Sequence, residues 1–268
     1  MHTFSLPLRP LALAVSVLFL SGCATFSQDG GFAKVQSLTK ERIGKDVMLV
    51  KSESDAATVE KTIEPLLAKP LSVDDAVTIA LLNNRGLQAD YAELGIAEAN
   101  LVQAGRLSNP LFSFTRLTRG DELSIERQLM LPIINLLTMP LATKIERRFF
   151  EQAQLRAASD ALRVADETRR AYFGAVAAQE TVKYMEQVKL SAEAGAELAL
   201  RMARVGNWSK LDQAREQTFY ADAVTQLARA KQTYASEREK LTRLMGPVGQ
   251  QDRVSIARSL AGLACRTA

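Results

Sequence analysis

The chain has 268 residues, of which 47% are hydrophobic and 24% are charged, so it is neither a disordered chain nor a polytopic helical membrane protein. Lys and Arg outnumber Asp and Glu by only 34 to 30, and no basic run with interleaved aromatic residues occurs, which argues against nucleic-acid binding. The single histidine is His2, and the sequence holds no Gly-x-Ser-x-Gly motif, paired Cys/His set or glycine-rich phosphate loop. We therefore expect no catalytic residue, metal site or cofactor, and we expect that the protein is not an enzyme.

The first 22 residues have the features of a secretory signal peptide. Arg9 supplies a positive charge ahead of an apolar stretch over residues 11–20, which is too short to cross about 30 Å of hydrocarbon. His2 would leave with residues 1–22.

Leu20-Ser-Gly-Cys23 resembles a bacterial lipobox, which implies that Cys23 is lipidated and becomes the first residue of the mature chain. Three acyl chains would anchor the protein stably, whereas one chain binds only marginally. Ala24, where lipoproteins retained at the inner membrane carry Asp, implies passage to the outer membrane. The alternative is an ordinary cleavage site with an incidental Cys. Because Cys265 is the one other cysteine, a lipidated Cys23 leaves no disulfide within one chain.

Residues 23–70 are mixed in character and are interpreted as a lipidated tether with little fold of its own, with one short candidate strand over Val47–Val50. The pattern changes at Ser72, a good N-cap followed by two acidic residues, and apolar residues then recur at helical spacing. The sequence predicts helices over residues 72–105, interrupted or kinked at Asn83–Gly86.

Over residues 111–131 the spacing of apolar residues changes from the helical period to the two-residue period of a strand. This change predicts a β-hairpin with its turn near residues 118–122. One face of the hairpin is apolar, through Phe112, Phe114, Leu123, Ile125, Leu129 and Leu131, and the other face carries Ser113, Thr115, Ser124, Glu126 and Gln128. This alternation is typical of a transmembrane β-barrel hairpin, and equally of a soluble amphipathic hairpin. Arg127 on the apolar face counts against the membrane interpretation. Two strands cannot close a barrel, so a barrel would need more chains or more sequence.

Residues 141–246 contain no proline and predict two long helices, over 141–205 and 209–246, that fold back on each other at the turn between them. Each helix carries small and apolar residues at alternating spacings of four and three, the repeat of a coiled-coil seam. The first seam is Ala157, Ala161, Val164, Thr168, Ala171, Ala175, Ala178, Val182 and Met185; the second is Tyr220, Ala223, Leu227, Ala230, Tyr234, Glu237, Leu241 and Leu244.

The returning helix carries a second stripe of small residues, made of Ala214, Thr218, Ala221, Thr225, Ala228 and Ala235. Two seams on one helix imply two neighbours, as in a closed tube or a sheet of helices. The sequence thus predicts a mainly α fold, with a long antiparallel coiled-coil helical hairpin and a small β-hairpin.

The order of these segments resembles the TolC-like outer membrane factors, a family of outer membrane efflux lipoproteins. The resemblance rests on the lipobox, on Leu71-Ser-Val-Asp-Asp-Ala-Val-Thr-Ile-Ala-Leu-Leu-Asn-Asn84, on the turn Arg201-Met-Ala-Arg-Val-Gly-Asn-Trp-Ser-Lys-Leu-Asp212 and on Leu241-Thr-Arg-Leu-Met-Gly246. It covers residues 71–246, which look like one of the two repeats of the family.

The resemblance implies a homotrimer whose chains together build a twelve-stranded outer-membrane barrel over a periplasmic tunnel of helices. Such channels are passive exit ducts of tripartite efflux pumps or type I secretion systems, for small solutes such as metal ions or drugs. The implied partners are a periplasmic adaptor (membrane fusion) protein, an inner-membrane transporter reached through that adaptor, and outer-membrane lipid. The implied location is the cell outer membrane, with the helices in the periplasm.

The turn of the helical hairpin is the candidate adaptor-contact tip. In the family this region docks against the adaptor hairpin, and by that resemblance the contact residues are Arg204, Val205, Gly206, Asn207 and Ser209, with Arg201 and Trp208 as outer members. Helix geometry offers a second explanation, because Gly206 suits a left-handed helix end and Ser209 with Asp212 suits a capped helix start.

The sequence shows one repeat where the family has two, and the tail over residues 247–268 shows no onset of a second. One interpretation is a truncated or frameshifted product; the other is a functional half-length protein, since six copies of two strands would also give twelve and a hexamer. A competing hypothesis for the function is a lipid-anchored periplasmic coiled-coil adaptor or scaffold without a pore.

Overall fold

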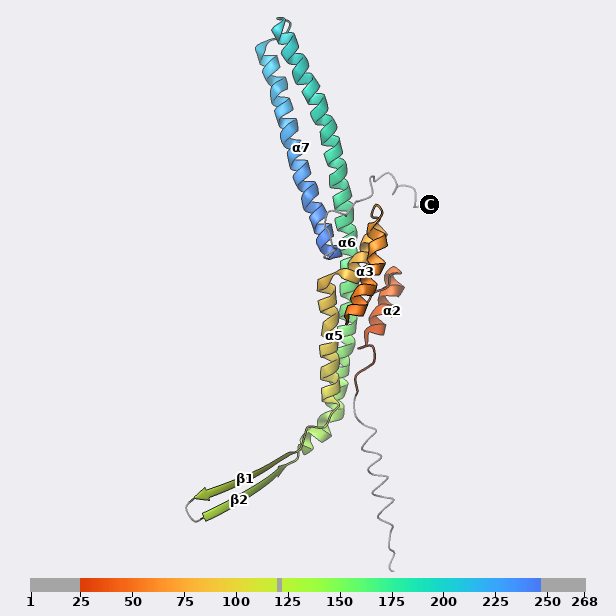
Figure 1. Cartoon of the computed structure of the whole chain (residues 1–268), viewed down its shortest axis with the longest axis vertical. Coiled ribbons are helices and arrows are strands. Elements are labelled where there is room, and N and C mark those ends of the chain that lie inside the picture. Colours follow the sequence, from red (N-terminus) through yellow and green to blue (C-terminus); the bar gives the residue numbers. More distant parts are fainter. Residues whose placement is uncertain (1–24, 120–121, 247–268) are drawn as a thin grey trace, which may run out of the picture. The chain divides into compact units, whose positions relative to one another are not determined.

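The computed structural model describes residues 25–119 and 122–246, so the predicted signal peptide, Cys23 and the tail over residues 247–268 lie outside the described residues. In chain order, the elements are α2 (Phe32–Ile43), α3 (Glu53–Leu67), α4 (Val73–Asn83), α5 (Arg85–Ala104), β1 (Leu111–Arg119), β2 (Glu122–Met130), α6 (Ile133–Arg204) and α7 (Lys210–Met245) (Figure 1). The predicted mainly α fold, with one long helical hairpin and one β-hairpin, is confirmed.

The described chain divides into two compact units. Unit 1 contains residues 25–35 and 91–157, and unit 2 contains residues 36–90 and 158–246. Unit 1 therefore holds the β-hairpin, and unit 2 holds the helical hairpin with its turn.

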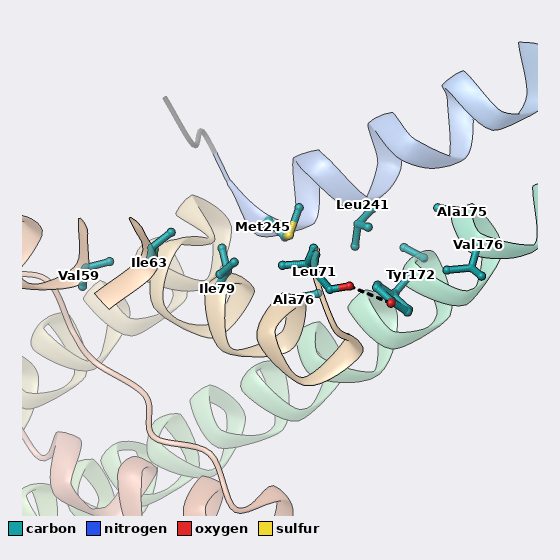
Figure 2. Close-up of a cluster of buried hydrophobic side chains, with 11 residues drawn as sticks. Val59, Ile63, Leu71, Ala76, Ile79, Tyr172, Ala175, Val176, Leu241 and Met245 are labelled. Carbon is teal, nitrogen blue, oxygen red and sulfur yellow. Dashed lines mark hydrogen bonds between the residues drawn. The ribbon is translucent and has the colours of Figure 1, made fainter. Parts of the chain in front are cut away.

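The core of unit 2 lies where α3 and α4 meet α6 and α7 (Figure 2). Its buried members are Val59, Ile63, Leu71, Ala76, Ile79, Ala171, Tyr172, Ala175, Val176, Leu241 and Met245. The hydroxyl of Tyr172 donates to the carbonyl oxygen of Leu71 at 2.9 Å, which gives this buried aromatic ring a polar partner. The core thus ties the base of the helical hairpin to the segment that precedes α4.

The interpretation of residues 23–70 as a tether with little fold is wrong, because this region contains α2 and α3. Ser52 caps α3, and Asp55 returns a bond to the Ser52 backbone, which completes a capping box. Val59 and Ile63, four residues apart, then point into the core of unit 2. Only two of the fifteen residues of α3 are buried, which gives too weak a periodicity to stand out in a mixed sequence.

The candidate strand over Val47–Val50 is also wrong, because its backbone groups bond to glutamine side chains instead of a neighbouring strand. The Gln36 amide donates to the Val47 carbonyl at 3.1 Å. Gln88 accepts from the Val50 N–H at 3.0 Å and donates to the Met48 carbonyl at 2.8 Å. Side chains from two helices therefore satisfy the backbone of an extended segment, a pairing that a strand pattern does not reveal.

The predicted interruption between α4 and α5 falls at Asn84, whose backbone is extended, at φ −67° and ψ 116°. Its side-chain oxygen accepts from the Leu87 N–H at 2.9 Å, at the start of α5. The amides of Asn83 and Asn84 also donate to the carbonyl oxygens of Met245 and Leu244, at 3.0 and 2.8 Å. Asn84 therefore ends α4, and both asparagines satisfy carbonyls at the end of α7, since helix ends leave such groups unpaired.

Helix α6 starts at Ile133, eight residues before the predicted bound at residue 141. Pro140 lies inside it and removes one helical hydrogen bond, but its fixed φ is compatible with a helix. Threonine hydroxyls bond to helix carbonyls on either side of the proline, from Thr138 to Ile134 at 3.0 Å and from Thr143 to Met139 at 2.8 Å. The proline therefore interrupts the bonding of this helix without ending it.

Candidate functional site

The turn between α6 and α7 is a closed, hydrogen-bonded helix end followed by a capped helix start. The Asn207 N–H donates to the Met202 carbonyl at 3.0 Å and the Gly206 N–H to the Ala203 carbonyl at 3.2 Å, which is the bond pair of a Schellman motif. Gly206 has φ +79°, in the left-handed region that glycine favours. The carbonyls of Met202 and Ala203, in the last turn of α6, are thereby satisfied.

Helix α7 begins after Ser209, its N-cap. The Asp212 N–H donates to the Ser209 hydroxyl oxygen at 3.1 Å, and the Ser209 hydroxyl donates to the Asp212 carboxylate at 2.6 Å. Asp212 also lies in the first turn of α7, where a negative charge is favourable. Turn geometry therefore accounts for Gly206 and Ser209 without any partner.

Turn geometry leaves other residues of the predicted tip unexplained. Val205 is 69% exposed, and Trp208 and Asn207 are also exposed. Arg201 forms an ion pair with Glu197 one turn back, and both Arg201 and Arg204 have exposed side chains. The structure thus brings all seven predicted tip residues together on one exposed turn of unit 2, with apolar and cationic groups side by side. Whether this surface contacts an adaptor stays a prediction.

The α6 seam turns inward as predicted for most of its length. Ala157, Ala161, Val164, Thr168, Ala171, Ala175 and Ala178 are buried, and Val182 and Met185 are partly buried. The spacing continues beyond the predicted set to three more buried alanines, Ala192, Ala196 and Ala199. These three carry the 3.5-residue repeat almost to the turn, and the same spacing could have located them in the sequence.

Large acidic residues of α7 meet glycines of α6. A Cβ on Gly174 would lie 3.1 Å from the Glu237 carboxylate, and a Cβ on Gly195 would lie 3.3 Å from that of Glu216. Each glycine leaves room for the acidic side chain opposite, so the charged member of the predicted α7 seam is accommodated between the helices.

The second stripe of α7 is exposed in the single chain. Ala214, Thr218, Ala221, Thr225, Ala228 and Ala235 all face away from α6. Within the described residues of one chain, no helix covers this face of α7. The predicted second neighbour of α7 therefore stays a prediction about assembly.

The groove at the base of the helical hairpin is lined by charged side chains that pair locally. Lys240 contacts Glu237 at 2.5 Å, and Arg170 contacts Asp166 at 2.8 Å. The residues that line the groove are Glu167, Arg170, Ala171, Glu237, Lys240, Arg243 and Leu244. Side chains of opposite charge alternate along this open groove and pair with one another. The groove is therefore a solvated surface between two helices, and it offers no concentration of one charge that would bind a ligand.

The β-hairpin of unit 1 has one apolar face that no described residue covers. Strands β1 and β2 pair antiparallel in a register that places Phe112 opposite Leu129 and Ser113 opposite Gln128. Directly opposite residues share a face. Phe112, Phe114, Leu123, Ile125 and Leu129 therefore form the apolar face, as predicted, and each of them is exposed.

Two arginines interrupt this apolar face, each opposite an apolar residue: Arg127 opposite Phe114, and Arg116 opposite Ile125. Exposed apolar residues continue beyond the strands into the first turns of α6, at Ile133, Ile134, Leu136, Leu137 and Leu141. A single soluble chain rarely exposes so much contiguous apolar surface, which marks this part of unit 1 as an interaction surface.

Other kinds of site are not found in the part of the chain that the structure describes. None of its helices combines the length and apolar character needed to span a bilayer. Its His, Cys, Asp and Glu side chains form no group of three that could hold a metal ion.

Comparison with known proteins gives one sequence relative and several structural neighbours. No protein-family model matches the chain. Over 202 residues, the chain is 28% identical to the cobalt-zinc-cadmium resistance protein CzcC of Cupriavidus metallidurans, an alignment that covers 75% of this chain and 48% of CzcC.

Two solved structures share the fold. A membrane protein from Pseudomonas aeruginosa matches with a TM-score of 0.59 at 15% identity, over 70% of this chain and 47% of that one. The CmeC outer membrane channel of Campylobacter jejuni matches with a TM-score of 0.56 at 18% identity, over 66% of this chain and 41% of that one. The chain spans about half the length, or less, of these three proteins. The predicted resemblance of this chain to the TolC-like outer membrane factors is therefore confirmed, over a span of about half their length.

Proposed function

We propose that this chain is a component of an outer-membrane channel, the passive exit duct of a tripartite efflux or type I secretion system. The observation that carries this proposal is the β-hairpin of unit 1, two nine-residue strands with one exposed apolar face. Strands of about 9–11 residues cross an outer membrane when tilted, and they present alternate residues to lipid. The likeness to CmeC, described as an outer membrane channel, supports the same assignment.

The duct requires several hairpins. One chain contributes two strands, and a barrel must close on itself because an open sheet edge cannot face lipid. With a second, similar half the assembly would be a homotrimer; with this length alone, six copies would supply twelve strands. The exposed small-residue stripe of α7 would pack against a neighbouring helix in either assembly, since small residues let helices approach closely.

The solutes proposed for the duct are small, and metal ions are the first candidates because CzcC is named for cobalt, zinc and cadmium resistance. The duct carries out no chemistry of its own in this proposal. An inner-membrane transporter supplies the energy, and a periplasmic adaptor joins the two proteins.

The adaptor is proposed to dock on the tip formed by Arg201 and residues 204–209. Val205 and Trp208 offer apolar contact area, and the two arginines offer charge-assisted hydrogen bonds to an acidic partner. Lipidation of Cys23 is proposed to hold the chain at the outer membrane, with the helical hairpin in the periplasm.

Photo-crosslinking in cells tests the docking and the function together. A photoreactive benzoylphenylalanine at Val205 should crosslink to a periplasmic adaptor encoded by the same bacterium. The same group at Gln232, an exposed residue midway along α7, serves as the matched control and should not. Equal yields at both positions, or no crosslink at Val205 in protein recovered from the outer membrane, would contradict adaptor docking.

A further inference from the structure

We infer that Arg116 and Arg127, on the apolar face of the β-hairpin of unit 1, form a binding site for the phosphate group of an anionic membrane lipid whose acyl chains lie over apolar residues of the same face. The site goes beyond general contact with membrane lipid, because it selects lipids by charge. The position of this face in a membrane rests on the proposed function; the pairing of the two arginines with an anionic lipid does not.

The register of the strands brings the two arginines together. Arg116 is paired with Ile125, and Arg127 is paired with Phe114, two positions further along the hairpin. The arginines are therefore diagonal neighbours on one face, with their Cβ atoms about 7 Å apart in ordinary antiparallel geometry. Both side chains are exposed. Two long guanidinium side chains at this spacing can reach one anionic group from two sides.

The strands supply no counter-charge on this face. Their acidic residues stand at positions of the opposite face, Glu126 opposite Thr115 and Glu122 opposite Arg119. A second copy of the hairpin presents the same residues on the same face, so packing of copies side by side brings no acidic residue of these strands to the two arginines. The group that neutralises the arginines therefore comes from outside the strands.

Two unneutralised arginines would oppose the burial of the apolar face. A charged side chain that faces lipid destabilises an outer-membrane strand, most strongly at mid-depth. Pairing with an anion offsets this penalty, since hydrogen bonds between ionised groups are roughly twice as strong as those between neutral groups. Phosphate suits arginine in particular, because the planar guanidinium donates two parallel hydrogen bonds to its oxygens.

The same face supplies contacts for acyl chains. Phe112 and Leu129 form a wholly apolar pair on it, and Leu131 and Ile133 continue the exposed apolar surface toward α6. Arg116 lies four residues from Phe112, about 13 Å along the strand. A cationic area thus lies beside a wholly apolar area, and a lipid with a phosphate head group and acyl chains is complementary to both.

The order of these two areas along the hairpin fits an outer leaflet. The arginine pair lies on the side of the hairpin turn, and the wholly apolar pair lies on the side where the strands join α5 and α6. In the proposed channel the helices are in the periplasm, so the turn side is the outer side. The phosphate would then lie outward of its acyl chains, as it does in a lipid of the outer leaflet.

Native mass spectrometry of the full chain in dodecyl maltoside tests the site by lipid titration. Phosphatidic acid is the probe, and phosphatidylcholine is the zwitterionic control. The wild type should bind phosphatidic acid more tightly than phosphatidylcholine. Arg116→Gln/Arg127→Gln should weaken phosphatidic acid binding about tenfold or more, because two charge-assisted contacts are lost, and should leave phosphatidylcholine binding unchanged.

Two further double variants control for charge and for geometry. Arg148→Gln/Arg156→Gln removes two exposed arginines from α6 of unit 1, the nearer of them about 20 Å along the helix from its start, and should leave the binding of both lipids unchanged. Arg116→Lys/Arg127→Lys keeps the charges but loses the planar donor pairs, so its affinity for phosphatidic acid should fall about threefold.

Equal affinities of the wild type and Arg116→Gln/Arg127→Gln for phosphatidic acid would overturn the site, and so would an equal loss in Arg148→Gln/Arg156→Gln. Displacement of phosphatidic acid by an equal concentration of inorganic phosphate would overturn the lipid as the ligand, since acyl chains would then add nothing. Circular dichroism shows whether each variant is folded. Should the glutamine variant fail to fold, unchanged affinity in Arg116→Lys/Arg127→Lys would overturn the site.

Outer-membrane fractionation distinguishes failure of the site from failure of the proposed function. An oligomer recovered from the outer membrane that shows no preference for phosphatidic acid would overturn the arginine site alone. Wild-type protein recovered outside the outer membrane would contradict the channel, and the titration in detergent would still decide whether the two arginines bind an anionic lipid.

Discussion

Gly206 and Ser209 form the turn of the helical hairpin through local geometry, Gly206 with a left-handed backbone and Ser209 as the N-cap of α7. The sequence predicts both the left-handed glycine and the serine that caps α7, because each follows a local rule, and the structure has both. Local rules could not predict that Asn83 and Asn84 would donate to carbonyls at the end of α7, about 160 positions along the chain. Nor could they predict that Glu98 would be buried with Ser27 as its donor. Such pairs depend on tertiary packing, which one sequence does not encode in any short pattern.

Gly206→Ala should lower the free energy of unfolding by about 1 kcal/mol, because an L residue at φ +79° is strained and open space around the turn offers no compensating contact. Chemical denaturation of the purified protein measures this change. Gly95→Ala is the matched control, because Gly95 lies inside α5 with a free surrounding and helical alanine is favoured by about 0.5–1 kcal/mol. A stabilising effect of Gly206→Ala would contradict the left-handed turn.

Unit 2 should lose stability in acid as the carboxylate of Asp75 becomes protonated. Burial raises the pKa of this carboxyl, but hydrogen bonds from Ser72 and the nearby Lys69 ammonium outweigh burial and hold the pKa below its ordinary value of 3.8. A depressed pKa contributes stability that is present above the unfolded-state value and is lost as the pH falls through the folded-state value.

Urea unfolding from about pH 6 to about pH 3 measures that loss. Asp75→Asn should be less stable than the wild type near neutrality and should show a shallower decline toward low pH. Asp74→Asn, which changes the exposed neighbouring carboxylate, is the control. Identical pH profiles for Asp75→Asn and the wild type would exclude this contribution.

At the scale of elements, periodicity predicted the structure well wherever the repeat was long. The α6 seam, the α7 seam and the alternating faces of the β-hairpin all follow from regular spacing over many residues. Prediction failed where the pattern was short or irregular: α2 and α3 were missed, the strand at Val47–Val50 does not form, and α6 continues through Pro140. At two of these places side-chain hydrogen bonds pair with the backbone: a capping box starts α3, and Gln36 and Gln88 bond to residues 47–50.

Ala199→Leu should destabilise the helical hairpin by about 1–3 kcal/mol, because Ala199 is fully buried in the seam and a larger side chain would force α6 and α7 apart. Ala177→Leu adds the same volume on an exposed face of α6 and should change stability little. Thermal melting by circular dichroism compares the two variants. Equal melting temperatures would mean that Ala199 does not lie between the helices.

At the scale of the whole molecule, the described residues of one chain leave two surfaces exposed: the apolar face of the β-hairpin in unit 1 and the small-residue stripe of α7 in unit 2. The order of segments was enough to predict the family resemblance, because the family is defined by that order more than by any one motif. The number of copies in an assembly does not follow from one chain, since symmetry contacts are made by surfaces that the single chain leaves exposed.

Ala228→Leu should separate folding from assembly. Ala228 is exposed in the middle of the stripe, so the larger side chain should leave the melting temperature of the dissociated chain nearly unchanged. If the stripe packs closely against a neighbouring helix, the same change should shift the protein toward smaller species in size-exclusion chromatography with light scattering. Ala223→Leu, on the buried seam, should impair folding instead. Unchanged oligomers in Ala228→Leu would show that the stripe is not an assembly contact.

The measurement that tests the channel assignment most directly is native mass spectrometry of the protein extracted from separated outer membranes. We predict that the protein is recovered in the outer-membrane fraction as an oligomer whose hairpins supply twelve strands: six copies of this chain, or three longer protomers that contain it. A monomer, or recovery outside the outer membrane, would contradict the channel and favour a scaffold without a pore.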